Sequence, residues 1–449
     1  MPPEFSAGDT AWVLASAALV LLMTPAVALF YGGMVRAKSV LNMMMMSFGA
    51  LGLVTVLWVL YGYSMAFGDD LGAGLVGDPT QFFGLNGLMA ADSLVFAVPS
   101  LAFVGFQGVF AVITVALISG AIADRARFSA WMVFVGIWAT IVYFPVAHWV
   151  FAFDGMTAGT DSLGGWIANT LGALDFAGGT AVHINAGAAG LALALVLGRR
   201  IGFGKEPLRP HNLTLVMLGA GMLWFGWFGF NSGSAIAANN FAAVAWINTF
   251  VAPGAAALGW LITERLRDGH PTSLGAASGV VAGLVAITPA AASVSQLGAI
   301  AIGLLSGVLC ALAVGLKYTF NYDDSLDVVG VHLVGGVVGT LAIGLFATAQ
   351  APGAFDVNGL FYGGGFGQLG KQAIGAAAVL LYSFVLTYII GKIIEATMGF
   401  RVDEETEASG VDVALHAESA YDLAHLGGGN TGFHSPPKSV NTSSERVQA

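Results

Sequence analysis

The sequence predicts an all-α integral membrane protein with eleven transmembrane helices, built as two inverted five-helix repeats plus an eleventh helix. Three observations carry this prediction. Of the 449 residues, 57% are hydrophobic and only 9% are charged, whereas soluble domains carry roughly 25% charged residues. The apolar runs reach the length of about 20 residues that a spanning helix needs. Basic residues follow every second run, which indicates a regular alternation of sides.

Each of the eleven runs is uniformly apolar and contains no alternation of polar and apolar residues over short stretches. Helices satisfy their own backbone hydrogen bonds and are therefore predicted for all of them. The expected spans are 11–31, 41–67, 93–121, 128–153, 176–197, 212–232, 240–263, 273–290, 296–316, 326–347 and 367–396.

The distribution of Lys and Arg predicts the orientation. Of the 16 basic residues, all but Lys371 follow an odd-numbered span or lie at the end of the last one. Cytoplasmic loops are enriched in Lys and Arg, so we expect the N-terminus outside and the C-terminus in the cytoplasm, with the protein in the cell membrane. The first ten residues lack the basic region of a cleavable signal peptide, so we interpret Met1 as the mature start.

Two histidines, His183 and His332, lie within the expected spans, and each is followed by glycine four and seven residues later. If spans 1–5 and 6–10 are the two halves, each half has an odd number of spans, so the halves are inverted. The histidines then occupy equivalent positions on the fifth and tenth spans. Ionisable residues in spans commonly mark a transport path, and inverted repeats commonly place that path at their interface. The alternative is a pair of core histidines satisfied by backbone carbonyls.

Three further features have both a functional and a structural interpretation. Asp175 is either a helix N-cap at the end of span 5 or a direct substrate contact. Phe106 and Phe110 are one helical turn apart and share a face, an arrangement that is more often packing than a site. The segment 226–234, GWFGFNSGS, mixes aromatic rings with small hydroxyls, which suits the recognition of a small cation by cation–π contacts and hydrogen bonds.

At these motifs the chain resembles the ammonium transporter (Amt/Mep/Rh) family over essentially its whole length up to residue 422. Several long motifs occur in the order that the family shows. They are DFAGGTAVHIN at 175–185, GWFGFNSGS at 226–234, DVVGVH at 327–332, GFRV at 399–402 and GVDVALHAESAY at 410–421.

The resemblance implies an eleven-helix fold, a homotrimer, one pore per subunit and the substrate ammonium or ammonia. It also implies roles for single residues: a twin-histidine pair, a stacked phenylalanine gate, an outer cation-recruitment site, a Trp that lines the pore, and an Asp that organises the site from behind. By this resemblance the twin-histidine pair is His183 and His332, and the stacked gate is Phe110 and Phe230. The recruitment site is Phe110, Phe151 and Ser234. The Trp that lines the pore is Trp227, and the organising Asp is Asp175.

One position departs from the family pattern. The segment after His148 usually ends in Trp, whereas here it ends in Phe151. Trp149 does not replace the missing indole, since two residues on a helix are about 200° apart. Phenylalanine is also a weaker cation–π partner than Trp, so the recruitment site is expected to differ from that of its relatives.

An energetic comparison explains why such a path would carry histidines and no charges. Burying an ion carries an effective penalty of several kcal/mol, whereas removing a proton from ammonium at pH 7 costs only ~3 kcal/mol. Potassium cannot lose a proton, so this energetic comparison predicts selectivity for ammonium over potassium. Neutral imidazoles can each offer a donor or an acceptor to ammonia.

The domain prediction is a transmembrane domain over 1–397, a cytoplasmic regulatory region over 398–426 and a disordered tail over 427–449. From the resemblance we expect Arg401, Gly410, Asp412 and Tyr421 to be regulatory. The tail is expected to couple neighbouring subunits through ionic contacts with the loops. A PII-type regulatory protein is the expected partner at the cytoplasmic face, together with membrane lipid around the spans; no cofactor, metal or nucleic acid is expected.

Two rival functions remain at this point. The first is an ammonium sensor that signals through its C-terminal tail, although the sequence contains no kinase, cyclase or other output domain. The second is an intramembrane enzyme that uses Asp175 and His183, although no nucleophile or metal set has suitable spacing, since Cys310 is alone on another span. The prediction is therefore a transporter and not an enzyme.

Overall fold

The fold is described from a computed structural model, which describes residues 4–154, 156 and 163–421. It confirms the predicted fold class, because eleven helices in this part of the chain are long and apolar enough to cross a membrane. The spans are Ala7–Met34, Val40–Phe67, Ser100–Ile122, Phe128–Phe151, Gly179–Leu197, Leu213–Ser232, Asn240–Asp268, Ser273–Ala290, Gln296–Phe320, Val329–Phe346 and Gly367–Met398. The seventh span runs to Asp268, beyond its predicted end at residue 263.

Most spans combine an α-helix with a short stretch of a second helix type. The α-helical parts are α1 (Ala7–Met34), α2 (Val40–Leu57), α3 (Tyr63–Phe67), α4 (Ser100–Ile118), α5 (Phe128–Trp138), α6 (Phe144–Phe151), α7 (Asn185–Leu197), α8 (Leu213–Trp227), α9 (Asn240–Asp268), α10 (Ser273–Ile287), α11 (Gln296–Ala313), α12 (Leu316–Phe320), α13 (Val334–Phe346) and α14 (Gly367–Met398). Outside the spans lie the hairpin of β1 (Leu94–Val95) and β2 (Val98–Pro99), and the tail helices α15 (Glu404–Ser409) and α16 (Val411–His416).

π-Helical turns interrupt several spans. They are η1 (Trp58–Gly62), η4 (Ala139–Tyr143), η6 (Gly179–Ile184), η7 (Phe228–Ser232) and η9 (Val329–Leu333). Such turns are rare and are frequent at functional sites. Two of them, η6 and η9, contain His183 and His332, so both candidate pore histidines lie on locally widened helix turns.

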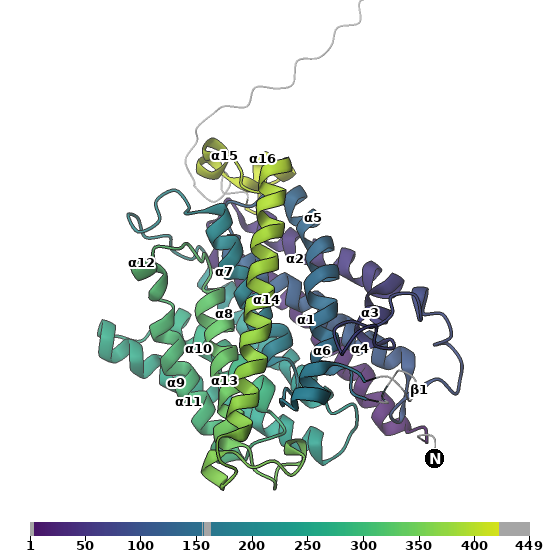
Figure 1. Cartoon of the computed structure of the whole chain (residues 1–449). Coiled ribbons are helices and arrows are strands. Elements are labelled where there is room, and N and C mark those ends of the chain that lie inside the picture. Colours follow the sequence, from purple (N-terminus) through teal and green to yellow (C-terminus); the bar gives the residue numbers. More distant parts are fainter. Residues whose placement is uncertain (1–3, 155, 157–162, 422–449) are drawn as a thin grey trace, which may run out of the picture.

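The helices form one bundle whose two faces carry different parts of the chain (Figure 1). The tail helices α15 and α16 cover one face, called here the tail face, and the N-terminus lies at the opposite, N-terminal face. This opposite placement agrees with an odd number of spans. The long helix α14 crosses the outside of the bundle (Figure 1) and packs on α5, α7 and α13, as expected for a helix outside the two repeats.

The repeat-equivalent helices pack in a reciprocal way. Helix α1 of the first half lies against α8 of the second half. A Cβ on Gly33 of α1 would lie 2.8 Å from the amide nitrogen of Val216, and a Cβ on Gly219 of α8 would lie 2.6 Å from that of Phe30. Each glycine therefore admits the partner's backbone, so the two antiparallel helices pack closely near the end of α1 and the start of α8.

Candidate functional site

The two candidate pore histidines meet where the fifth and tenth spans cross. Gly187, four residues after His183, faces Leu333, and a Cβ there would lie 2.5 Å from the Leu333 amide nitrogen. Gly336, four residues after His332, faces Ile184 with a corresponding distance of 3.1 Å. In each half, the glycine four residues after the histidine thus contacts the residue that directly follows the histidine of the other half. This reciprocal crossing brings the two imidazoles together at the repeat interface.

The imidazoles interact directly. Their Nδ1 atoms are 3.2 Å apart, and the rings are nearly parallel with centroids 5.4 Å apart. One Nδ1 must donate and the other accept, so the two neutral rings are held in opposite tautomers. The ring that accepts at Nδ1 carries its single N–H proton on Nε2. The ring that donates from Nδ1 leaves its Nε2 free as an acceptor. The buried Nε2 of His183 has no hydrogen-bond partner among the described residues, so it can bind a passing molecule.

Asp175 fixes the start of the helix that carries His183. Its carboxylate accepts backbone N–H groups of Gly178, Gly179, Thr180 and Ala181 at 2.7–3.4 Å and also accepts the Thr180 hydroxyl. This geometry is that of a buried N-cap. Both carboxylate oxygens are used by the protein itself, so the side chain holds the start of the helix that carries His183.

Asp324 is the counterpart of Asp175 in the second half. Each aspartate stands eight residues before its histidine. The Asp324 carboxylate accepts the N–H groups of Val328 at 3.1 Å and Val329 at 2.7 Å, at the start of the turn that carries His332. The sequence reasoning missed this residue, although the shared spacing was a signal that could have identified it.

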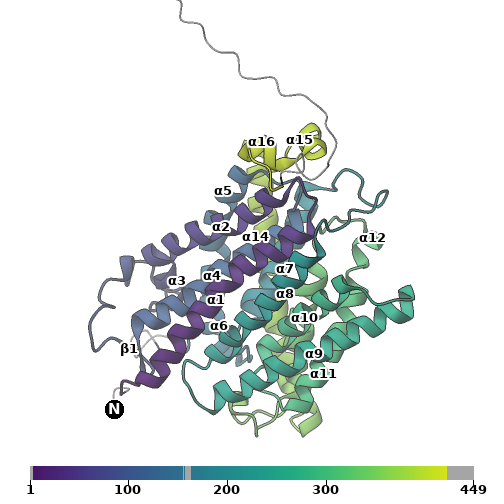
Figure 2. The same ribbon diagram turned by 180° about the vertical axis from the view of Figure 1, so that it is seen from behind.

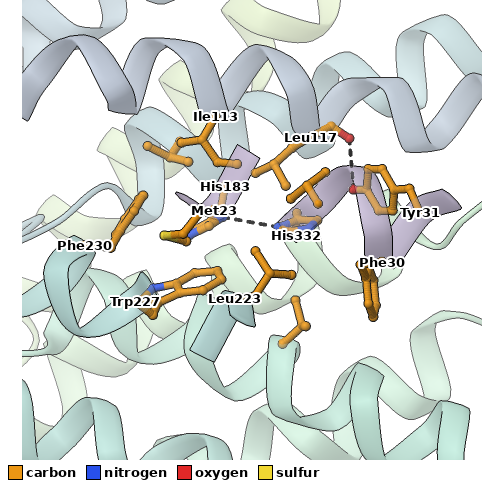
Figure 3. A pocket seen from close by; sticks show the side chains of 13 residues that line it. Met23, Phe30, Tyr31, Ile113, Leu117, His183, Leu223, Trp227, Phe230 and His332 are labelled. Atoms are coloured by element: carbon orange, nitrogen blue, oxygen red, sulfur yellow. Dashed lines mark hydrogen bonds between the residues drawn. The ribbon is translucent and has the colours of Figure 1, made fainter. Parts of the chain in front are cut away.

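A narrow cavity adjoins the histidine pair (Figure 3). It leaves about 10 Å³ for the centre of a water-sized molecule, which is about the room that one such molecule requires. Its wall is apolar apart from the two imidazoles and the Tyr31 hydroxyl, which donates to the carbonyl of Leu117 at 3.1 Å. The other lining residues are Met23, Val27, Phe30, Ile113, Leu117, Val182, Leu223, Trp227, Phe230 and Val281.

Aromatic rings close the cavity beyond His183. Phe110 and Phe230 are stacked with ring centroids 4.2 Å apart, and Phe106 lies 4.9 Å from Phe110. Trp227 stacks on His183 at 5.5 Å and donates its indole N–H to the Thr288 hydroxyl at 2.9 Å. The Phe110–Phe230 pair leaves no gap between its rings, so passage at this point requires the rings to move.

A second small cavity lies on the other side of His332, toward the tail face. It shares Phe30, Tyr31, Val281 and His332 with the first cavity, but its wall also contains the hydroxyl of Ser278 and the carboxylate of Asp327. Asp327 accepts a hydrogen bond from the Lys317 ammonium at 2.6 Å. The two cavities beside the histidines therefore run from an aromatic closure to a polar end, called here the polar mouth.

The two other expected recruitment residues, Ser234 and Phe151, lie in different surroundings. The Ser234 hydroxyl donates to the carbonyl of Phe230 at 2.8 Å. Phe151 is buried, and its ring lies beside Gly178, in the turn that Asp175 caps. Among the described residues Phe151 forms no ring contact with Phe110 or Phe230, so it lies at the turn that Asp175 caps and not in the stack.

The match with known proteins covers the whole described transmembrane region. The model of the Ammonium Transporter Family matches residues 11–421. The chain belongs to the ammonium transporter family. An ammonium transporter of Mycobacterium tuberculosis is 61% identical over 440 residues, which cover 94% of this chain and 91% of that protein. An ammonium transporter of Aquifex aeolicus is 49% identical, with 94% and 95% covered.

Solved structures agree with this assignment. Saccharomyces cerevisiae Mep2 has a TM-score of 0.80 and 35% identity, with 90% of this chain and 89% of that chain covered. A protein described as a sensor Amt protein has a TM-score of 0.82 and 29% identity, with 91% and 98% covered. The chain is thus a multi-pass membrane protein for ammonium transport, and it is not an enzyme.

A buried charge network supports the tail face of the transporter. Arg200 pairs with Asp323 at 2.9 Å and with Asp124 at 3.0 Å, and Arg125 donates to the Asp323 carbonyl at 2.7 Å. Burial alone would raise the pKa of Asp323, but the hydrogen bond and charge of Arg200 and the charge of Arg125 outweigh it and lower that pKa. Burial lowers the pKa of Arg125 to about 10. The network joins the loops after spans 3, 5 and 9.

The four expected regulatory residues hold the tail on this face of the transporter. Arg401 pairs with Glu407 of the tail itself at 2.7 Å, and Glu407 accepts the Ile201 N–H. Gly410 has a φ of +131°, which lets its backbone lie against Lys38. Residues 422–426 of the expected regulatory region, and the expected disordered segment 427–449, lie outside the described residues.

Asp412 and Tyr421 make the remaining tail contacts. The Asp412 carboxylate accepts the N–H groups of Leu41 at 3.0 Å and Asn42 at 2.8 Å, and so caps α2 of the transporter from the tail. The Tyr421 hydroxyl lies 2.8 Å from Nε2 of His211. These two residues thus join the tail to the start of span 2 and to the loop before span 6.

Proposed function

We propose that the transporter recruits ammonium at the N-terminal face, releases its proton near the Phe110–Phe230 gate and conducts ammonia past His183 and His332. The observation that carries this proposal is the pair of imidazoles, 3.2 Å apart, beside an apolar cavity the size of one small molecule. Phe110, Phe151 and Ser234 form the recruitment site, with Trp227 lining the path and Asp175 organising it.

The geometry supports a neutral passenger. Among the described residues, the wall of the first cavity contains no carboxylate that could replace the hydration shell of a cation. An unpaired ion at such a place would carry a penalty of several kcal/mol, whereas deprotonating ammonium at pH 7 costs only ~3 kcal/mol. Opposite tautomers give ammonia one acceptor and one donor along the pair.

The polar mouth at the tail face suits the return to water. Ser278 and Asp327 face the cavity beyond His332, and a carboxylate there favours a cation over neutral ammonia. Ammonia that has passed His332 regains a proton at this mouth. In this proposal, groups that stabilise a cation lie at the two ends of the path, and neutral groups lie at its centre.

The proposal places the tail face in the cytoplasm and the protein in the cell membrane as a homotrimer. The basic residues Arg36, Lys38, Arg125, Arg200 and Arg401 gather at the tail face, in agreement with the enrichment of Lys and Arg in cytoplasmic loops. Large apolar side chains are exposed along α9 and α11, among them Leu258, Ile262 and Leu304, and these suit contact with lipid or neighbouring subunits.

Regulation through the tail belongs to the same proposal. Asp412 caps α2 and Glu407 binds the loop after span 5, so a movement of the tail would change the ends of spans that surround the path. A PII-type protein bound at the tail face would act through these contacts. Deleting 399–421 is expected to reduce ammonium transport, and pull-down with a PII-type protein tests the partner.

The decisive test measures ammonium-dependent flux and current with purified protein in liposomes. We expect ammonia flux that saturates with ammonium and excludes potassium. A current that accompanies the flux means that the proton follows through the imidazoles, and flux without current means that it returns to the outer side. The sensor alternative, which the fold shared with a sensor Amt protein keeps open, requires that wild type shows no such flux.

A further inference from the structure

His148 lies outside the path but is held as firmly as the residues within it. Its side chain is completely buried in the last turn of α6, and the side chain of Asp70 is 6% exposed. Nδ1 lies 3.0 Å from the carbonyl oxygen of Ala66, and Nε2 lies 3.4 Å from Oδ1 of Asp70. The imidazole thus bridges the end of the second span and the loop that follows it.

A neutral His148 and an ionised Asp70 lack a proton between them. A favourable contact between Nε2 and the carboxylate requires one more proton. A carbonyl oxygen can only accept, so the contact with Ala66 places a proton on Nδ1. In a neutral ring Nε2 is then an acceptor, and it faces a carboxylate that is also an acceptor. The contact is favourable when a proton lies on Nε2 or on Asp70. No described residue forms a hydrogen bond with Nε2. A shared proton would complete the contact with Asp70, and the contact weakens when that proton leaves.

The His148–Asp70 pair holds the loop at residues 70–75, which packs against α6 and the segment around residue 166. Asp70 also accepts the Gly74 N–H at 2.8 Å, and the indole N–H of Trp149 donates to the Leu75 carbonyl at 2.7 Å. The Gly74 carbonyl in turn accepts the Trp166 N–H at 3.2 Å. These bonds clamp residues 70–75 over the end of α6 and the segment around residue 166.

Phe151 stands at the end of the same helix, one turn after His148. Its ring lies beside Gly178, and the turn at Gly178 is fixed by Asp175 at the start of the His183 helix. Because α6 carries both His148 and Phe151, the clamp on His148 sets where the Phe151 ring stands relative to that turn.

We propose that His148, through its proton-dependent contact with Asp70, is a positioning residue that sets Phe151 at the ammonium-recruitment site and makes recruitment depend on pH. This inference rests on the proposed recruitment role of Phe151. The predicted consequence is a change in KM with pH at the N-terminal face, with little change in kcat.

Other titratable groups on the packed segments need a control. Of the described acids nearby, Asp70 is the one that comes within ion-pair distance of His148. Position 161 is also an aspartate but lies outside the described residues. The further titratable residues on the segments around His148 are Tyr63, Asp69, Asp78 and Asp154.

The test compares wild type with Asp70→Asn in proteoliposomes, with KM and kcat for ammonium measured from about pH 5 to about pH 9 at the N-terminal face. The Asn amide cannot ionise and can still accept the Gly74 N–H, so residue 70 carries no charge at any pH in this variant and cannot share a proton with Nε2. We expect KM, expressed as ammonium concentration, to rise severalfold with pH in wild type and to stay flat in Asp70→Asn. Equal pH slopes of KM in the two proteins would overturn the proposal.

Asp69→Asn is the matched control, since it removes the same charge from the same loop and should keep the wild-type slope. If Asp70→Asn does not fold, His148→Gln takes its place, because its amide still donates to Ala66 and does not titrate. A slope that persists in His148→Gln would also overturn the inference. Failure of the proposed function is distinguishable, because it appears as an absence of ammonium flux in wild type at every pH.

Discussion

The two halves of the transporter present the same device in different surroundings. In each half an aspartate caps the helix turn that carries a histidine eight residues later, and a glycine four residues after the histidine admits the other half. Around Asp175 and His183 the neighbours are Trp227 and Phe230, and the cavity is closed by stacked rings. Around Asp324 and His332 they include Asp327 and Lys317.

The comparison separates what the repeat supplies from what each half adds. The repeat supplies two imidazoles at the interface, aligned by two capped helix turns. Around His183 the added groups are aromatic rings, Phe110 from the first half and Trp227 and Phe230 from the second, and they exclude hydrated ions. The second half adds hydroxyl and charged groups, which favour a return to water. Directional difference in the path thus comes from side chains around a nearly symmetric backbone.

The largest expected difference concerns the two capping aspartates. Asp175→Ala leaves up to four buried N–H groups without an acceptor, and each unsatisfied group costs about 1–3 kcal/mol. Asp324→Ala frees two such groups. We expect ammonium flux per folded protein to fall further in Asp175→Ala than in Asp324→Ala. Equal losses of ammonium flux in the two variants would contradict this expectation.

A smaller difference is expected between the two crossing glycines. A Cβ on Gly187 would lie 2.5 Å from the backbone of Leu333, whereas one on Gly336 would first meet the side-chain Cγ1 of Ile184 at 3.0 Å. The side chain can shift and the backbone cannot, and overpacking costs about 1–3 kcal/mol. Gly187→Ala should therefore lower the unfolding temperature in detergent more than Gly336→Ala. The reverse order would contradict the described crossing.

The aromatic and polar sides can be compared by one truncation each. Phe110→Ala opens the stacked closure and is expected to reduce selectivity for ammonium over potassium about tenfold, which is ~1.4 kcal/mol. Ser278→Ala removes a hydroxyl from the opposite mouth and should leave selectivity nearly unchanged. Liposome fluxes of both ions provide the measurement. Loss of selectivity in Ser278→Ala alone would move the selectivity filter to the polar mouth.

The smallest effect concerns pH. Burial and the charge of Asp327 raise the pKa of Asp324 from 3.8 to about 6. A raised pKa means that the folded state binds this proton more tightly than the unfolded state. Relative to Asp324→Asn, wild type should lose stability as pH rises from about 4 to about 6. Unfolding temperatures of both proteins across this range give the test, and a difference that stays constant would reject the shift.

Sequence patterns sufficed for the spans, the inverted halves and the equivalence of His183 and His332, because lipid imposes length and apolar character on each helix. They left the role of Asp175 open, since capping and substrate contact demand the same residue type. The contact of Gly187 with Leu333 depends on how two spans cross, which a single sequence does not encode locally. The His148–Asp70 pair was missed for the same reason, since His148 lies on the fourth span and Asp70 in the loop after the second.

The central claim is that ammonium crosses as ammonia along the two imidazoles. Liposome flux of ammonium and potassium through the double variant His183→Ala with His332→Ala, set against wild type, tests it most directly. The account predicts a lower ammonium flux, a loss of preference over potassium, or both, because the hydrogen-bonding centre of the path is gone. An unchanged uptake rate together with unchanged selectivity would contradict it.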